Sequence, residues 1–211
     1  MNLIKFSQML CSRLCHDLIT PIGAINTSLE LLEESDPEDR LQLLELAKQS
    51  AEKAIRKLVF CRAAFGYSSD SHLSTIDQAK KLLQDFLMLN KIELLWEKEI
   101  QQSSEISSTF SQYAQVIANL SFICAEIAPY GGQLLIEFIK PQIIRLHLKG
   151  KLVPLRPIIL SSLTGELSED EMSSHVIQAI YTRMLCEKLY LALEINHQER
   201  VSLEFILRGN D

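Results

Sequence analysis

The sequence has no apolar run that approaches the length of a membrane-spanning helix, and residues 1–7 hold no signal-peptide core. Positive charge is also scarce, because 21 Lys and Arg stand against 27 Asp and Glu, for a net charge of −6. A protein whose main ligand is nucleic acid needs a basic face to meet the phosphates. We therefore expect a cytoplasmic protein that binds neither membrane nor nucleic acid.

The five cysteines do not form the pattern of a disulfide framework. Their number is odd, and four lie in helical apolar patterns, which predicts reduced thiols that pack in the core. Cys11, Cys15 and His16 lie close together, yet no second group of Cys and His completes a tetrahedral set of ligands. We expect no metal site.

Apolar residues are plentiful: 47% of the 211 residues are hydrophobic, enough for one large domain or two small ones. Residues 3–34 predict one long amphipathic helix. Asp36-Pro37 then marks a turn, in which Asp36 caps a second helix and Pro37 takes its first position. The second helix runs to about Phe65 and ends at Gly66. The two helices form an antiparallel hairpin.

Both helices of this hairpin carry an apolar stripe. One hairpin cannot bury two such stripes well, whereas two hairpins from two subunits form a four-helix bundle. We therefore expect a homodimer; the alternative is that the second half of the chain covers the stripes within a monomer. The stripes consist of Leu14, Leu18, Pro21, Ile25 and Leu32, and of Leu44, Ala47, Ala51, Ala54, Leu58, Cys61 and Phe65.

The expected domains are the hairpin at 1–67, a polar linker at 68–74 and an α/β domain at 75–211. In the last, helical patterns at 75–90, 111–127 and 173–190 alternate with strand patterns at 92–100, 134–139, 143–148, 191–195 and 201–207. Helices on one face of a mostly antiparallel sheet make an α/β sandwich. The predicted fold class is α+β.

The residues that most strongly indicate chemistry are His16 and Asp17 in the first helix. At about 100° per residue, His16 points about 200° away from Leu14 and so faces solvent. An exposed histidine often has no function, but Pro21 inside the same helix costs a few kcal/mol and indicates a functional constraint. The residues that share the outer half with His16 are Ser12, Arg13, Thr20, Gly23 and Thr27.

The string His16-Asp17-Leu18-Ile19-Thr20-Pro21 resembles the phosphoacceptor box of sensor histidine kinases. With Leu14-Cys15 before it and Ile22-Gly23-Ala24-Ile25-Asn26 after it, the stretch over about residues 10–34 resembles the ChpT-type histidine phosphotransferases. That resemblance implies a bacterial phosphorelay, in which phosphoryl groups pass between the receiver domains of a hybrid histidine kinase and of response regulators.

The order of elements in the second domain resembles the ATP-binding domain of histidine kinases, the Bergerat fold. Two departures are clear. The helix before the Gly131-Gly132 turn keeps one asparagine of the family pattern, Asn119, but has Ile123 at the second position. No Gly-x-Gly occurs among the seven glycines, although a phosphate lid needs the close backbone approach that glycine permits. We expect no ATP binding and no bound cofactor.

The phosphotransferase hypothesis gives each site residue a role. His16 attacks phosphorus, and Asp17 keeps one ring nitrogen protonated so that the other is nucleophilic. Thr20 places a water molecule or contacts the receiver, and Mg²⁺ comes with the receiver's acidic pocket. Arg13 meets a phosphate oxygen, and Ser12, Gly23 and Thr27 complete the partner-facing surface. Plain solvated side chains are the alternative for Thr20 and Arg13.

Two other functions fit the same sequence. One is an ATP-dependent sensor histidine kinase core with divergent nucleotide boxes. The other is a non-catalytic dimeric scaffold that binds receivers. Nucleotide binding distinguishes the first from a phosphotransferase, and transfer of a phosphoryl group to His16 distinguishes the second.

Overall fold

A computed structural model describes residues 2–66, 73, 75–96, 104–140 and 142–209. The chain divides into two units, Met1–Arg62 and Ala63–Asp211. The predicted linker at 68–74 and the second half of the predicted strand at 92–100 fall mostly outside the described residues, so both stay predictions. In the part of the chain that is described, no helix is long and apolar enough to cross a membrane.

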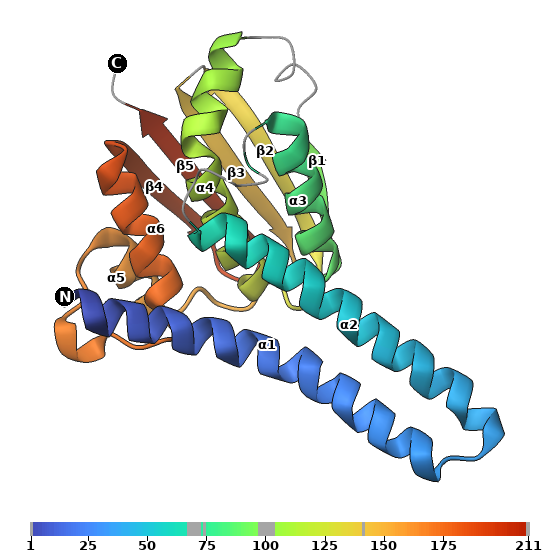
Figure 1. The fold of residues 1–211 in the computed structure, drawn as a ribbon. Helices are drawn as coiled ribbons and strands as arrows, with labels where there is room; N and C mark the ends of the chain where they lie inside the picture. Colours follow the sequence, from blue (N-terminus) through green and yellow to red (C-terminus); the bar gives the residue numbers. More distant parts are fainter. Residues whose placement is uncertain (1, 67–72, 74, 97–103, 141, 210–211) are drawn as a thin grey trace. The chain divides into compact units, whose positions relative to one another are not determined.

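The first unit is a helical hairpin of α1 (Leu3–Glu34) and α2 (Pro37–Phe65), which run antiparallel (Figure 1). Asn2 caps α1 by accepting a hydrogen bond from the amide of Ile4 at 2.9 Å. Pro37 is the first residue of α2, as predicted, because a first-turn residue has no helical partner for its missing N–H. Local signals therefore set the ends of both helices where the sequence predicts them.

The interface between α1 and α2 differs from the predicted stripes. On α1, Leu14, Leu18, Pro21, Ile25 and Leu32 are only half-buried, whereas Arg13, Asp17 and Ser28 are buried. On a helical wheel of α1, Asp17 and Ser28 lie within about 20° of each other, to one side of the predicted apolar stripe. Ser28 donates from its hydroxyl to the carbonyl of Ala24 at 2.8 Å, which satisfies the buried group. The contact between the two helices thus includes polar side chains of α1, while Ala47 and Cys61 of the predicted α2 stripe are buried as well. The burial of both stripes in a bundle of two copies stays a prediction.

The second unit contains a five-stranded sheet in the order β1-β2-β3-β5-β4. The strands are β1 (Ile92–Trp96), β2 (Gly132–Lys140), β3 (Ile143–Gly150), β4 (Leu191–Gln198) and β5 (Ser202–Gly209). Only β1 and β2 pair in parallel; the other neighbours are antiparallel. The prediction of a mostly antiparallel sheet is confirmed.

Helices α3 (Ile76–Met88), α4 (Ser104–Ile127) and α6 (Ile177–Lys188) lie on one face of the sheet (Figure 1). Alternate strand residues such as Leu134, Leu146 and Phe205 are fully buried toward this face. Two short elements were not predicted: α5 (Pro157–Thr164) and a 3₁₀ turn at Glu169–Glu171. An eight-residue helix is too short for periodicity to indicate it.

Candidate functional site

His16 lies midway along α1, and its side chain is 74% exposed. The helix continues without a break through Pro21, whose missing N–H leaves the carbonyl of Asp17 without its helical donor. The predicted exposure of His16 is confirmed. An imidazole presented in this way is accessible to the active site of another protein.

Asp17, the next residue, is only 9% exposed and lies in a cluster of charges. Its Oδ2 accepts a hydrogen bond from Arg13 Nε at 3.0 Å, and its Oδ1 lies 3.6 Å from Lys57 Nζ on α2. The same Oδ1 is 3.5 Å from Nδ1 of His16. The carboxylate of Asp17 is thus held by Arg13 of the same helix and lies beside Lys57 of the other helix.

This geometry places Nδ1 of His16 beside the carboxylate of Asp17. A neutral His16 that carries its proton on Nδ1 has its lone pair on Nε2. A carboxylate beside one ring nitrogen favours the tautomer that carries its proton on that nitrogen. The arrangement can therefore support nucleophilic attack by His16.

Of the other predicted site residues, four are exposed as expected and Arg13 is buried. Ser12, Thr20, Gly23 and Thr27 are exposed, as expected, and a Cβ added at Gly23 would meet no atom within 4 Å. The predicted exposure of Arg13 is wrong: the residue is 8% exposed and turned to Asp17. The wheel placed it in the outer half because the predicted interface was centred on the leucines rather than on Asp17.

Lys57 is the residue of this cluster that the sequence did not indicate. It lies 40 positions from Asp17, and only the register between α1 and α2 brings the two together. No local pattern in either helix encodes that register.

The cysteines also differ from the prediction. Cys61, Cys124 and Cys186 are buried, but Cys11 and Cys15 are exposed on α1. Burial, and then the nearby Asp17 carboxylate, raise the pKa of the Cys61 thiol to about 12. Cys61 therefore stays a neutral thiol beside the charged cluster. In the described segments, no three His, Cys, Asp or Glu side chains are grouped so that they could hold a metal ion.

Asn119, the asparagine retained on α4, has a structural role in the second unit. The residue is fully buried, and its Nδ2 donates to the carbonyl oxygens of Ala64 at 2.8 Å and Gln115 at 2.7 Å. Its Oδ1 accepts a hydrogen bond from Nε2 of Gln178 at 2.5 Å. Both ends of the amide are thus engaged, and Asn119 holds the last turn of α2 against α4 and α6.

Comparison with known proteins agrees with this architecture. A family model, the histidine phosphotransferase C-terminal domain, matches residues 76–201. The chain belongs to the histidine phosphotransferase family. A protein phosphotransferase ChpT of Brucella abortus (strain 2308) is 28% identical over an alignment of 204 residues, which covers 93% of this chain and 92% of that protein.

A solved structure shares the fold over nearly the whole length of this phosphotransferase. It is a bacterial phosphotransferase determined at 1.7 Å, and it is 26% identical with a TM-score of 0.78. The match covers 99% of this chain and 98% of the other. The predicted resemblance and the α+β fold are therefore confirmed, and the family supports a role in phosphotransfer.

Proposed function

We propose that this protein carries phosphoryl groups between receiver domains through a phosphohistidine at His16. The observation that carries the proposal is the pairing of an exposed imidazole with a buried, doubly anchored carboxylate at Asp17. Membership in the histidine phosphotransferase family supports the same reaction.

The reaction needs only a nucleophile and a docked receiver. Nε2 of neutral His16 attacks the phosphorus of an aspartyl phosphate in line, an N–P bond forms, and the P–O bond to the aspartate breaks. The aspartate leaves as a carboxylate, and its receiver departs. The carboxylate of a second receiver then attacks the phosphohistidine in the reverse sense. Mg²⁺ belongs to the receiver's acidic pocket in this scheme.

Neighbouring residues support His16 in different ways. Asp17 holds the proton on Nδ1 and compensates the charge that develops on the ring, while Arg13 and Lys57 keep Asp17 in place. We assign Arg13 to this positioning task rather than to contact with a phosphate. Thr20 contacts the receiver or a water molecule, and the exposed positions Ser12, Gly23 and Thr27 form the surface on which the receiver rests.

We also propose that the hairpin forms a four-helix bundle with a second copy. The support is a set of apolar side chains on both helices that stay exposed in the described part of the chain, which we call the apolar flank. On α1, Ile19, Ile22 and Leu29 are 67%, 53% and 49% exposed, and on α2, Leu44, Ile55 and Leu58 are 51%, 61% and 53% exposed. Exposed apolar side chains in such number indicate a protein interface.

The retained asparagine argues against the kinase alternative, because its amide is already engaged by Ala64, Gln115 and Gln178. Ile123, at the second position of the pattern, is buried and brings no oxygen ligand. ATP binding tighter than about 100 μM in calorimetry, roughly 5.5 kcal/mol, would favour the kinase.

The test of the site is direct labelling. A phosphorylated receiver is mixed with the wild-type chain, and acid-labile phosphate on the chain is measured beside His16→Ala and, as a matched control, His175→Ala. We expect label on the wild type and on His175→Ala and none on His16→Ala. Label on a correctly folded His16→Ala chain would contradict the assignment, and absence of label on every chain would favour a non-catalytic scaffold.

A further inference from the structure

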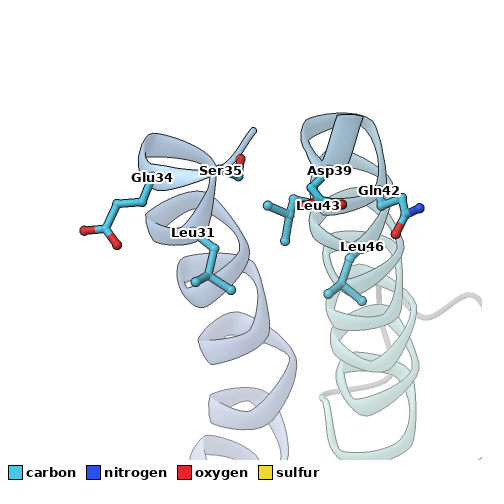
Figure 2. A pocket seen from close by; sticks show the side chains of 7 residues that line it. All are labelled: Leu31, Glu34, Ser35, Asp39, Gln42, Leu43 and Leu46. Carbon is cyan, nitrogen blue, oxygen red and sulfur yellow. The ribbon is translucent and has the colours of Figure 1, made fainter. Parts of the chain in front are cut away.

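The hairpin opens into a cleft at its loop end, about 22 Å along α1 from His16. We call it the tip cleft; its volume is about 580 Å³, and its walls come from the end of α1 and the start of α2. Figure 2 shows the side chain of Leu43 extending from α2 toward α1, with Leu31 on α1 and Leu46 on α2 at the two sides of the cleft. The full lining is Leu31, Glu34, Ser35, Asp39, Gln42, Leu43 and Leu46.

The apolar floor of the tip cleft is only partly covered. Leu31 is 50% exposed and Leu46 is 49% exposed, while Leu43 is half-buried. An apolar side chain placed between them would remove this surface from water, which is the main favourable contribution to most protein contacts. The cleft is large enough to receive side chains of leucine or phenylalanine size.

Two acids, Glu34 and Asp39, line the cleft, which lies in the most acidic stretch of the chain. Residues 30–45 contain seven Asp and Glu and one base, Arg40, while the rest of the chain has twenty of each sign. The whole net charge of the protein thus lies at this end of the hairpin. Arg40 donates from Nε to the carbonyl of Ser35 at 3.3 Å. Neither Glu34 nor Asp39 forms an ion pair with another described residue.

Helix stability explains only part of this charge. Glu38 and Asp39 lie in the first turn of α2, where the helix dipole favours acids. Glu34, however, is the last residue of α1, where the same dipole disfavours an acid, and the last turn of α1 holds no base. An acid kept in an unfavourable place beside an apolar cleft points to a ligand of opposite charge.

We propose that the tip cleft is a second docking site, which binds a basic amphipathic segment of a protein partner. Apolar side chains of that segment fill the space between Leu31, Leu43 and Leu46, and its lysines or arginines meet Glu34 and Asp39. The site goes beyond phosphotransfer at His16 and does not depend on it.

A second copy of this chain is the less suitable occupant. Two tip clefts that faced each other would set Glu34 and Asp39 of one copy against the same acids of the other, which opposes association through this surface. The cleft also lies away from the apolar flank. On a helical wheel of α1, Leu31 is turned about 60° from His16 to one side. Ile22 and Leu29, which belong to the flank, are turned about 120–140° from His16 to the other side.

The test uses the full chain and a short fluorescein-labelled peptide of leucines and lysines, with the leucines at helical spacing. Binding is followed by fluorescence anisotropy. We expect Glu34→Lys with Asp39→Lys, and separately Leu46→Asn, to weaken binding about tenfold or more, roughly 1.4 kcal/mol. Glu30→Lys with Glu45→Lys makes the same charge change outside the cleft, and Leu41→Asn changes a leucine that is 77% exposed. These matched controls should bind within about twofold of the wild type.

Three results would overturn the proposal. Equal weakening by both charge pairs would mean that the peptide responds only to net charge. Dissociation of a native dimer by Leu46→Asn in sedimentation would assign the cleft to the second copy. Absence of peptide binding to a folded wild-type chain would leave the cleft without the proposed ligand. His16→Ala should bind the peptide normally, so failure here and failure of phosphotransfer are separate outcomes.

Discussion

His16 and Asp17 are neighbours in the chain but have opposite environments. Because successive residues on a helix differ by about 100°, one side chain can face a partner while the next is buried against α2. His16 is 74% exposed and Asp17 is 9% exposed. The sequence predicted the first of these environments, because it depends only on the helix. It did not predict the second, because the burial of Asp17 depends on Arg13 and on Lys57 from the other helix.

Replacement of Asp17 by asparagine should therefore affect both chemistry and stability. Transfer should slow by about 10²–10⁴-fold, because the developing charge on His16 loses its counterion. The free energy of unfolding should fall by about 3–5 kcal/mol, because Arg13 remains buried without its carboxylate. Single-turnover transfer and urea unfolding measure the two effects, and Asp36→Asn in the loop is the control. Wild-type transfer and stability in Asp17→Asn would refute the role of this cluster.

The buried thiols should make the protein sensitive to alkaline pH. Burial raises the pKa of Cys61 and of Cys186 from 9.0 to about 12. In the unfolded chain these thiols ionise near pH 9, whereas in the folded chain they stay neutral until about pH 12. Their contribution to stability is thus complete below pH 9 and is lost as the pH rises toward 12.

Cys186→Ala isolates this effect from other groups that titrate. Between about pH 8 and pH 10.5, the wild type should lose about 2 kcal/mol more unfolding free energy than Cys186→Ala. Urea titrations in a reducing buffer at both pH values give the difference. Parallel loss in the two chains would show that the buried thiol ionises as readily as an exposed one.

The residues that begin and end helices and strands could be identified from the sequence, whereas the contacts between helices could not. Pro37, Gly66 and the Gly131-Gly132 turn mark ends of helices or strands that the structure places close to the prediction. The burial of Asp17 and Ser28 between α1 and α2 was not predicted, because it depends on the register of the two helices, and the burial of the apolar stripes in a bundle stays a prediction. Helix α5 was missed because eight residues are too few for a periodic pattern.

Asn119 links three elements of the second unit through its side-chain amide. Asn119→Ala should lower the free energy of unfolding by about 2–4 kcal/mol, because it removes the side-chain donor to the buried carbonyl of Ala64 and the shorter of two hydrogen bonds from Gln178 Nε2. Urea denaturation measures the loss, and Asn196→Ala, on the exposed strand β4, should change stability by less than about 0.5 kcal/mol. An equally small effect of Asn119→Ala would remove its structural role.

The match to the family model and the residues of the proposed site lie in different parts of the chain. The family model matches residues 76–201, whereas the residues to which we assign chemistry lie on α1 and α2. The similarity to a solved phosphotransferase extends over both units. The C-terminal unit keeps the fold expected from the sequence but uses its retained asparagine for packing.

The proposed dimer should depend on the apolar flank of the hairpin. Leu29→Glu combined with Leu58→Glu would bury four charges in each dimer, and each unpaired charge costs several kcal/mol. We expect monomers in sedimentation at micromolar concentration, with helical content unchanged because both leucines are exposed on the single chain. Thr27→Glu, on the face that carries His16, should remain a dimer. A monomeric wild type would contradict the bundle.

Passage of the phosphoryl group through His16 can be followed in a single-turnover relay. A receiver labelled with radioactive phosphate, the full chain and a second, unlabelled receiver are mixed, and label on all three is followed in time. We expect label to leave the first receiver, to appear transiently on the wild-type chain and to accumulate on the second receiver. With His16→Ala, the label should stay on the first receiver apart from its own hydrolysis. Accumulation on the second receiver in the presence of folded His16→Ala would show that the phosphoryl group does not pass through His16.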